Sequence, residues 1–136
     1  MREAKLFGVV GLLVAVLVLA ACGGGASQPA ASSGGGAGDA TAGKALFAQQ
    51  VIAPNPGCIT CHSLEAGKTL VGPSMAGIAS RAGSTVSGQS AEQYLRQSLA
   101  EPDAYVAKGF QKGLMPKPTI TDKQANDLLA YLQTLK

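Results

Sequence analysis

The sequence predicts a small all-α domain that folds around one large cofactor. Three segments carry helix signals, strand signals are sparse, and stretches rich in Gly and Pro lie between the helices. The region from residue 40 to 136 has no Trp and few other aromatic residues, so its own side chains offer only a thin hydrophobic core. We therefore expect a large apolar group to fill the centre of the domain.

Each expected helix has a recognisable boundary. The first helix spans roughly residues 41–51 and ends before Pro54. The second begins at Ser90, the first residue of a capping box, and ends at Pro102. The third begins at Thr121, which opens another capping box, and it carries one apolar stripe: Leu128, Leu129, Leu132 and Leu135.

Residues 1–21 are expected to be a signal peptide. A short basic start precedes an apolar run from Leu6 to Ala20, which is shorter than the roughly 20 apolar residues that a permanent membrane span needs. A retained membrane helix is the alternative. Leu19-Ala20-Ala21-Cys22 resembles the lipobox of bacterial lipoproteins, which implies cleavage before Cys22 and lipidation of its thiol. Two or more acyl chains would anchor the protein to the outer face of the bacterial cytoplasmic membrane.

Residues 22–39 are expected to act as a tether, and residues 40–136 as the folded domain. Between residues 23 and 38 the sequence is uncharged and consists largely of Gly, Ser and Ala, which favours a flexible chain. Ordering of this stretch against a partner subunit is the alternative. Cleavage before Cys22 would leave nine basic and seven acidic residues, and a net charge of about +2 is too low to indicate nucleic-acid binding.

The segment Cys58-Ile59-Thr60-Cys61-His62 matches C-x-x-C-H, the attachment motif for c-type haem. Thiols at this spacing reach the two vinyl groups of the porphyrin and form thioethers, and the next residue places its imidazole over the iron. A zinc site would need four ligands, but His62 is the only histidine. A thioredoxin-like redox pair would need a βαβ context that the sequence lacks. We therefore expect one haem c, attached through Cys58 and Cys61.

The haem iron also needs a second axial ligand, and the remaining candidates are Met75 and Met115. Met75 is so close to His62 that it would have to pass the haem edge within a short loop. Met115 is far enough along the chain to reach the opposite face of the haem. The alternative is that Met115 fills a gap in the core, as Met often does. We expect His62 and Met115 to be the iron ligands and Met75 to be a core residue.

From about residue 40 to 135 the sequence resembles class I cytochromes c, and this resemblance implies their fold. It implies that Gly43 and Phe47 in the first helix contact Tyr131 in the last, because a glycine lets two helix backbones approach closely. Met115-Pro116 resembles the family's ligand loop. The chain lacks the Trp and the lysine-dense face of mitochondrial-type members, so their mode of docking does not transfer to it.

The resemblance also implies roles for residues around the haem. Gly72-Pro73 is similar to the family's loop in which the proline carbonyl accepts the Nδ1–H of the haem histidine, and this bond would fix the tautomer of His62. Arg81 is similar to the family's arginine near a haem propionate, and a solvated arginine is the alternative. The segment 98–110 is similar to cytochrome c modules that are fused to, or bound by, terminal oxidases and related membrane complexes.

Ligation by His and Met would fill both axial positions, which leaves outer-sphere one-electron transfer as the chemistry. With the single histidine on the iron, His-based acid–base catalysis has no candidate, and we do not expect an enzyme. The leading interpretation is a tethered carrier between a quinol-oxidising complex and an oxidase or photosynthetic reaction centre. A fixed subunit of such a complex is the second interpretation. A haem enzyme or gas sensor, in which Met115 leaves the iron, is the third.

The expected partners are redox proteins or complex subunits, with no nucleic acid and no small-molecule substrate. Lys108, Lys112 and Lys117 bracket the expected ligand loop, so they would lie around the haem edge and attract an acidic partner. The alternative is that three separated lysines only keep a loop soluble. The two haem propionates would also cancel part of the positive field.

Overall fold

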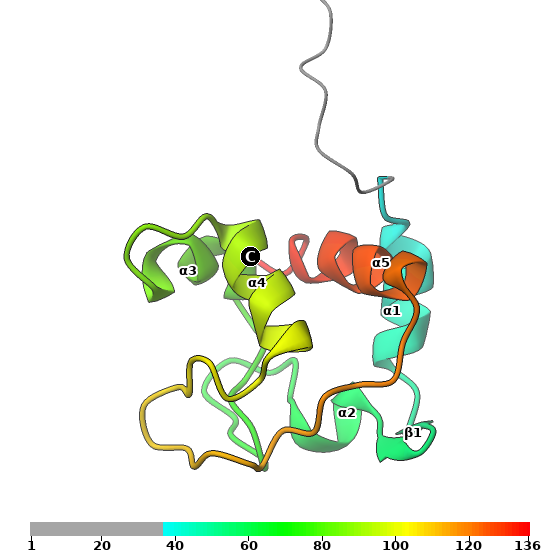
Figure 1. The fold of residues 1–136 in the computed structure, drawn as a ribbon, viewed down its shortest axis with the longest axis horizontal. Coiled ribbons are helices and arrows are strands. Elements are labelled where there is room, and N and C mark those ends of the chain that lie inside the picture. The colour runs from blue at the N-terminus through cyan, green and yellow to red at the C-terminus, as the bar shows by residue number, and fades with distance from the viewer. Residues whose placement is uncertain (1–36) are drawn as a thin grey trace, which may run out of the picture. The chain divides into compact units, whose positions relative to one another are not determined.

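The structure, a computed structural model, describes residues 37–136 (Figure 1). The expected signal peptide, the expected lipidation site Cys22 and most of the tether lie outside the described residues. The described chain is mostly helical, which confirms the predicted fold class. Its helices and strands are α1 (Ala40–Phe47), β1 (Val51–Ile52), β2 (Asn55–Pro56), α2 (Cys58–Cys61), α3 (Ile78–Thr85), α4 (Ala91–Ala100) and α5 (Asp122–Leu132).

Helices α1 and α5 cross in close contact and form the most extensive helix packing of the described chain (Figure 1). A Cβ atom at Gly43 would lie 1.9 Å from the backbone oxygen of Asp127, so this approach requires a glycine. The rings of Phe47 and Tyr131 pack together with their centroids 5.6 Å apart. The predicted contact between the first and last helices is therefore confirmed.

The N-terminus of α1 is fixed by a chain of polar contacts that ends on α5. The carboxylate of Asp39 caps α1 by accepting the N–H groups of Thr41 and Ala42. The backbone N–H of Asp39 donates to Asp127 Oδ1 at 2.8 Å. The other carboxylate oxygen of Asp127 accepts from Lys123 Nζ at 2.7 Å. The start of the domain is thus tied to α5 by side chains as well as by packing.

The core is formed where α1, α3, α4 and α5 meet. Three leucines of the predicted α5 stripe, Leu128, Leu129 and Leu132, are buried there, while Leu135 packs partly buried against them. The remaining buried apolar residues lie in the same four helices and in β1: Leu46, Phe47, Ile52, Ile78, Ala82, Leu95 and Tyr131.

Helices α4 and α5 begin where the sequence predicts them. Ser90 accepts the backbone N–H of Gln93, whose side chain accepts the N–H of Ser90 in return. Thr121 and Gln124 form the same pair of bonds at the start of α5. The first helix differs from the prediction, because it ends at Phe47 and the chain then turns into the β1–β2 hairpin.

Helix α3 was not predicted, because its sequence lacks the usual start signal. Its N-cap is Gly77, which has a left-handed φ of 69° and offers no capping side chain. Tertiary contacts hold the helix instead: Ile78 and Ala82 are buried, and the N–H of Ala79 donates to the backbone oxygen of Leu135 at 3.0 Å. Packing therefore stabilises a helix for which the local sequence has only a weak preference.

The connection between α4 and α5 contains neither helix nor strand over residues 101–121. It appears in yellow to orange in Figure 1 and runs as an extended loop around one side of the described chain. None of the helices between residues 37 and 136 combines the length and apolar character that crossing a membrane requires. The long connection contributes many of the residues that line a cleft in the fold.

Candidate functional site

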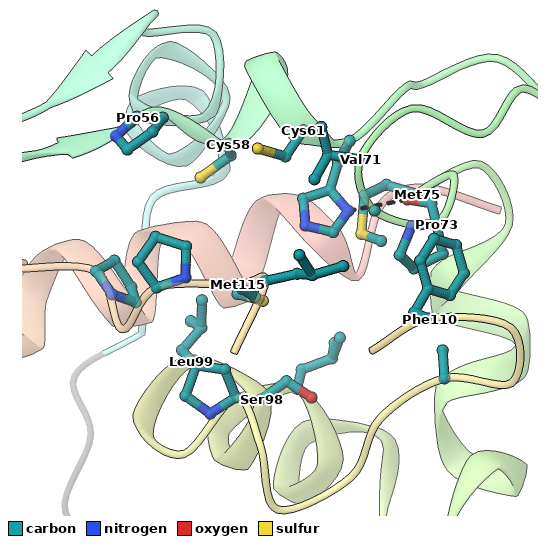
Figure 2. A pocket seen from close by; sticks show the side chains of 18 of the residues that line it. Pro56, Cys58, Cys61, Val71, Pro73, Met75, Ser98, Leu99, Phe110 and Met115 are labelled. Atoms are coloured by element: carbon teal, nitrogen blue, oxygen red, sulfur yellow. Dashed lines mark hydrogen bonds between the residues drawn. The ribbon is translucent and has the colours of Figure 1, made fainter. Parts of the chain in front are cut away.

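A cleft lined mainly by apolar side chains lies inside the fold, and residues from the C-x-x-C-H motif form part of its wall. Figure 2 shows Cys58 and Cys61 on α2, with Met115 on the long connection extending into the same space. Helix α4 and the remainder of the connection supply further apolar and aromatic lining: Tyr94, Leu95, Leu99, Tyr105, Val106, Phe110 and Leu114. One cleft thus brings together residues that are widely separated in sequence.

The two cysteines lie one helical turn apart on the short helix α2, so both side chains lie on one face of it and line the cleft. Both thiols are free. Burial raises the pKa of the Cys58 thiol above its ordinary value, against a smaller opposing effect of its backbone hydrogen bond. The helix is held at its start by the Thr60 hydroxyl, which donates to the backbone oxygen of Gly57 at 2.6 Å.

The imidazole of His62 is held by the backbone of the segment 72–75. His62 Nδ1 lies 2.9 Å from the backbone oxygen of Pro73. A carbonyl can only accept, so Nδ1 carries the proton and Nε2 keeps its lone pair for a metal. Two backbone bonds fix this segment beside the motif: Gly72 N–H donates to Cys61 O, and Met75 N–H donates to Ser63 O, each at 2.8 Å.

Gly72 lies directly against the imidazole ring. A Cβ atom at this position would lie 2.6 Å from His62 Cε1 and 2.9 Å from Nδ1. Real Cβ atoms do not approach other atoms this closely, so any larger residue would push the ring away from its bond to Pro73. The Gly-Pro pair therefore supplies both the space and the acceptor that orient His62.

The two methionines of the described chain both line the cleft, but in different settings. Met75 is the last residue of the segment that holds His62, and it packs partly buried against the hydrophobic core. Met115 belongs to the long connection and keeps 36% of its surface exposed. Of the two, Met115 is therefore the more exposed methionine in this structure.

Arg81 does not line the cleft. Its guanidinium group is exposed and donates to the backbone oxygens of Ala76 and Ser74. These bonds hold the loop that follows Pro73 and precedes α3. In this structure Arg81 therefore braces the loop beside the His62 segment, and its predicted contact with a haem propionate stays a prediction.

The cleft has the residues that a covalently attached haem requires. It offers two free thiols on one helix face, an imidazole with Nε2 available, a thioether on another segment and an apolar lining. Within residues 37–136, no three His, Cys, Asp or Glu side chains gather as ligands for a bare metal ion. The donor set and the lining together fit haem c.

Several residues of the site were not identified from the sequence. Tyr94 and Tyr105 form an edge-to-face pair with ring centroids 5.8 Å apart, and both line the cleft. Asp103 and Asn55 also line the cleft and bind the backbone of the long connection. Tyr94 lies on an apolar face of a predicted helix, which is a signal for burial, but no sequence pattern distinguishes the other three.

Comparison with known proteins gives consistent matches for this region. The family model described as Cytochrome c matches residues 40–136. The chain is similar to a cytochrome c2 of Rhodopseudomonas palustris, with 32% identity over 123 residues that cover 72% of this chain and 99% of that protein. Cytochrome c2 iso-2 of Magnetospirillum molischianum is 35% identical over 88 residues, which cover 58% of this chain and 91% of that protein. The residues matched by the family model contain the whole cleft lining.

Proposed function

Because the chain belongs to the cytochrome c family and carries haem c attached through Cys58 and Cys61, we propose that it is a membrane-tethered electron carrier with His62 and Met115 as its iron ligands. Members of this family carry single electrons. The observation that best supports the ligand assignment is that both residues line one apolar cleft, although they come from opposite ends of a long stretch of sequence.

When bound, haem c supplies a reversible one-electron couple, and a methionine ligand raises its reduction potential. The chain's own residues orient the ligands and exclude water. Pro73 fixes the tautomer and direction of His62, while the apolar lining lowers the local dielectric. His62 is the only histidine of the chain, so none is left to move a proton for a substrate. We therefore propose electron transfer without catalysis.

The proposed role is to link membrane complexes of a respiratory or photosynthetic chain as a mobile carrier. The names of the relatives, cytochrome c2, are compatible with a carrier of this kind. A fixed subunit of a membrane complex is the second candidate. It rests on the expected resemblance of the segment 98–110 to cytochrome modules of terminal oxidases, and several residues of this segment line the cleft.

The proposed anchor is a lipid on Cys22, at the end of the expected signal peptide of residues 1–21. Cys22→Ser should abolish acylation and move the protein from the membrane fraction to the soluble extracytoplasmic fraction, or leave it unprocessed. Intact-mass analysis of the native protein is the direct measurement. A mature protein without acyl chains on Cys22 would show that the lipoprotein assignment is wrong, and the haem assignment would be unaffected.

Covalent attachment and ligation are tested separately. The wild-type protein, produced in a host that matures cytochromes c, should stain for haem after denaturing electrophoresis, and Cys58→Ala with Cys61→Ala should not. Met115→Ala should lose the sulfur-to-iron charge-transfer band of the ferric protein and lower its reduction potential. Met75→Leu, which conserves volume, is the control and should keep both. If Met75→Leu loses the band and lowers the potential while Met115→Ala keeps both, the ligand assignment is wrong.

A further inference from the structure

The segment 111–120, which carries Met115, has little structure of its own. Among the described residues it contains no helix or strand and makes no backbone–backbone hydrogen bond of good geometry. Its side chains are largely exposed, and Leu114 keeps 47% of its surface accessible. A segment with so few buried contacts opens at low free-energy cost unless other groups hold it.

Two side chains from outside the segment bind its backbone on either side of Met115. Asp103 Oδ1 accepts the N–H of Gly113 at 2.8 Å. Asn55 Nδ2, in the β1–β2 hairpin, donates to the backbone oxygen of Lys117 at 3.0 Å. Gly113 lies two residues before Met115 and Lys117 lies two residues after it, so the two bonds bracket the thioether.

The two bonds come from independent parts of the fold. Asp103 follows α4, whereas Asn55 lies immediately before the haem-attachment helix α2. Both residues also line the cleft. Gly113 has a left-handed φ of 78°, which residues with a side chain rarely adopt, so its N–H direction depends on glycine. The segment is therefore fixed at two points that flank Met115, once to an earlier part of the same connection and once to the β1–β2 hairpin.

We propose that Asp103 and Asn55 are positioning residues, whose two hydrogen bonds hold Met115 in the cleft and so exclude external ligands from the iron. This inference rests on the proposed ligation by Met115. An external ligand can bind only when the segment opens, so its apparent affinity scales with the open population. Removing either bond raises that population. A carboxylate is a stronger acceptor than a neutral group, so the Asp103 bond has the larger effect.

The test is imidazole binding to the ferric holoprotein, followed by the visible spectrum. Asp103→Ala should lower the imidazole dissociation constant about fivefold and Asn55→Ala about threefold, the range expected for one net hydrogen bond. Asp103→Asn keeps an acceptor oxygen and should change the constant less than twofold. The double variant should show at least the product of the two single effects, because both bonds hold one segment.

Two further measurements separate positioning from charge. Glu101→Ala is the matched control: it removes an exposed carboxylate two residues from Asp103, and no hydrogen bond of that carboxylate is present in the described chain. Loss of negative charge alone raises the reduction potential, whereas a weakened Met115 bond lowers it. Asp103→Ala should therefore lower the potential and Glu101→Ala should not. Hydrogen exchange at Gly113 in the holoprotein should also be faster in Asp103→Ala.

The inference is overturned if Asp103→Ala and Asn55→Ala both bind imidazole as the wild type does. It is also overturned if Asp103→Asn or Glu101→Ala reproduces the effect of Asp103→Ala, because charge would then be the cause. If Asp103→Ala does not fold, the Asn55→Ala result decides. A wild type that lacks the thioether band, and binds imidazole as tightly as Met115→Ala, refutes the proposed ligation. A wild type with the band but unresponsive variants refutes only the two positioning residues.

Discussion

At the scale of single residues, the orientation of His62 depends on a neighbouring backbone segment. The bond from Nδ1 to Pro73 determines which ring nitrogen faces the cleft, and Gly72 leaves the space that the ring occupies. Backbone bonds to Cys61 and Ser63 fix this segment, and the imidazole cannot turn without losing its bond to Pro73. His62 is thus already oriented for the ligation that we propose.

Gly72→Ala tests this dependence. The added methyl group would overlap the imidazole, so the unfolding free energy of the holoprotein should fall by about 1–3 kcal/mol, and the ferric haem spectrum should change. Thr69→Ala, at an exposed position of the same loop, should stay within about 0.5 kcal/mol of the wild type. Denaturant unfolding measures both variants. A Gly72→Ala protein with wild-type stability and spectrum would show that the ring does not need this space.

The residues of the site differ in how far the sequence predicts them. The C-x-x-C-H motif is contiguous, so its cysteines and His62 can be identified without knowledge of the fold. Met115 is predicted as a ligand because His62 is the only histidine and because Met75 lies too close to His62 in sequence to reach the opposite face of the haem. Asp103 and Asn55 were not predicted, because each binds a backbone group, and backbone partners leave no pattern in side-chain spacing. Arg81 illustrates the same difficulty, because its partners here are carbonyl groups.

At the scale of helices, the sequence predicts an element best when both its cap and its apolar stripe are local. Helices α4 and α5 have capping boxes followed by buried leucines, and both begin where expected. Helix α3 starts at a glycine and is held by contacts with α4 and the C-terminal residues, none of which is local. The early end of α1 likewise depends on the hairpin that follows it.

The close approach of α1 and α5 predicts that alanine substitution at two helical glycines changes stability in opposite directions. Gly43→Ala should lower the unfolding free energy by about 3 kcal/mol, because its methyl group would meet a backbone oxygen that cannot move aside. Gly83→Ala in α3 meets only ordinary contacts, the nearest being Ala91 N at 3.5 Å. It should therefore raise stability by about 0.5–1 kcal/mol through helix propensity. Equal denaturation midpoints for the two variants would contradict the close approach.

Asp127 should make a pH-dependent contribution to the stability of the α1–α5 interface. The hydrogen bond from Lys123, and then the backbone N–H of Asp39, lower the pKa of this carboxyl below its ordinary value of 3.8. Its contribution to stability is therefore complete above pH 3.8 and is lost as the pH falls through the lower folded-state pKa. Asp127→Asn should lower the Tm by a few degrees at pH 7.

The Tm difference between wild type and Asp127→Asn should disappear in strong acid, and thermal unfolding monitored from pH 7 to pH 2 measures it. Lys123→Gln is the companion variant, because it removes the largest cause of the lowered pKa and leaves the bond to Asp39 intact. It should show a smaller version of the same pH dependence. A difference that stays constant over the whole range would mean that the charge of Asp127 does not stabilise the interface.

At the scale of the whole molecule, electron exchange depends on the charge around the cleft. Lys108, Lys112 and Lys117 are all exposed, and they alternate in sequence with residues that line the cleft, such as Phe110 and Leu114. We therefore predict that their positive field covers one approach to the site. An anionic reaction partner should be attracted there, and the attraction should weaken as salt screens the charges.

Oxidation of the reduced protein by ferricyanide, a small trianion, measures this field without a protein partner. The rate should fall with ionic strength, and replacing the three lysines by glutamine should slow it about threefold at low salt. The matched control replaces Lys44, Lys68 and Lys136 by glutamine, which gives the same change in net charge at other exposed positions. Equal slowing in both triple variants would assign the effect to net charge and not to the segment around Met115.

The contact between α1 and α5 also determines when the domain can close. The bond from Asp39 to Asp127 joins residues 88 positions apart, and Gly43 meets α5 over a similar separation. Such a contact can form only after α5 has been synthesised, and closing a loop of this length costs chain entropy. During synthesis, the C-x-x-C-H motif emerges before α5. We therefore predict that both thiols can react with haem before the α1–α5 contact has formed.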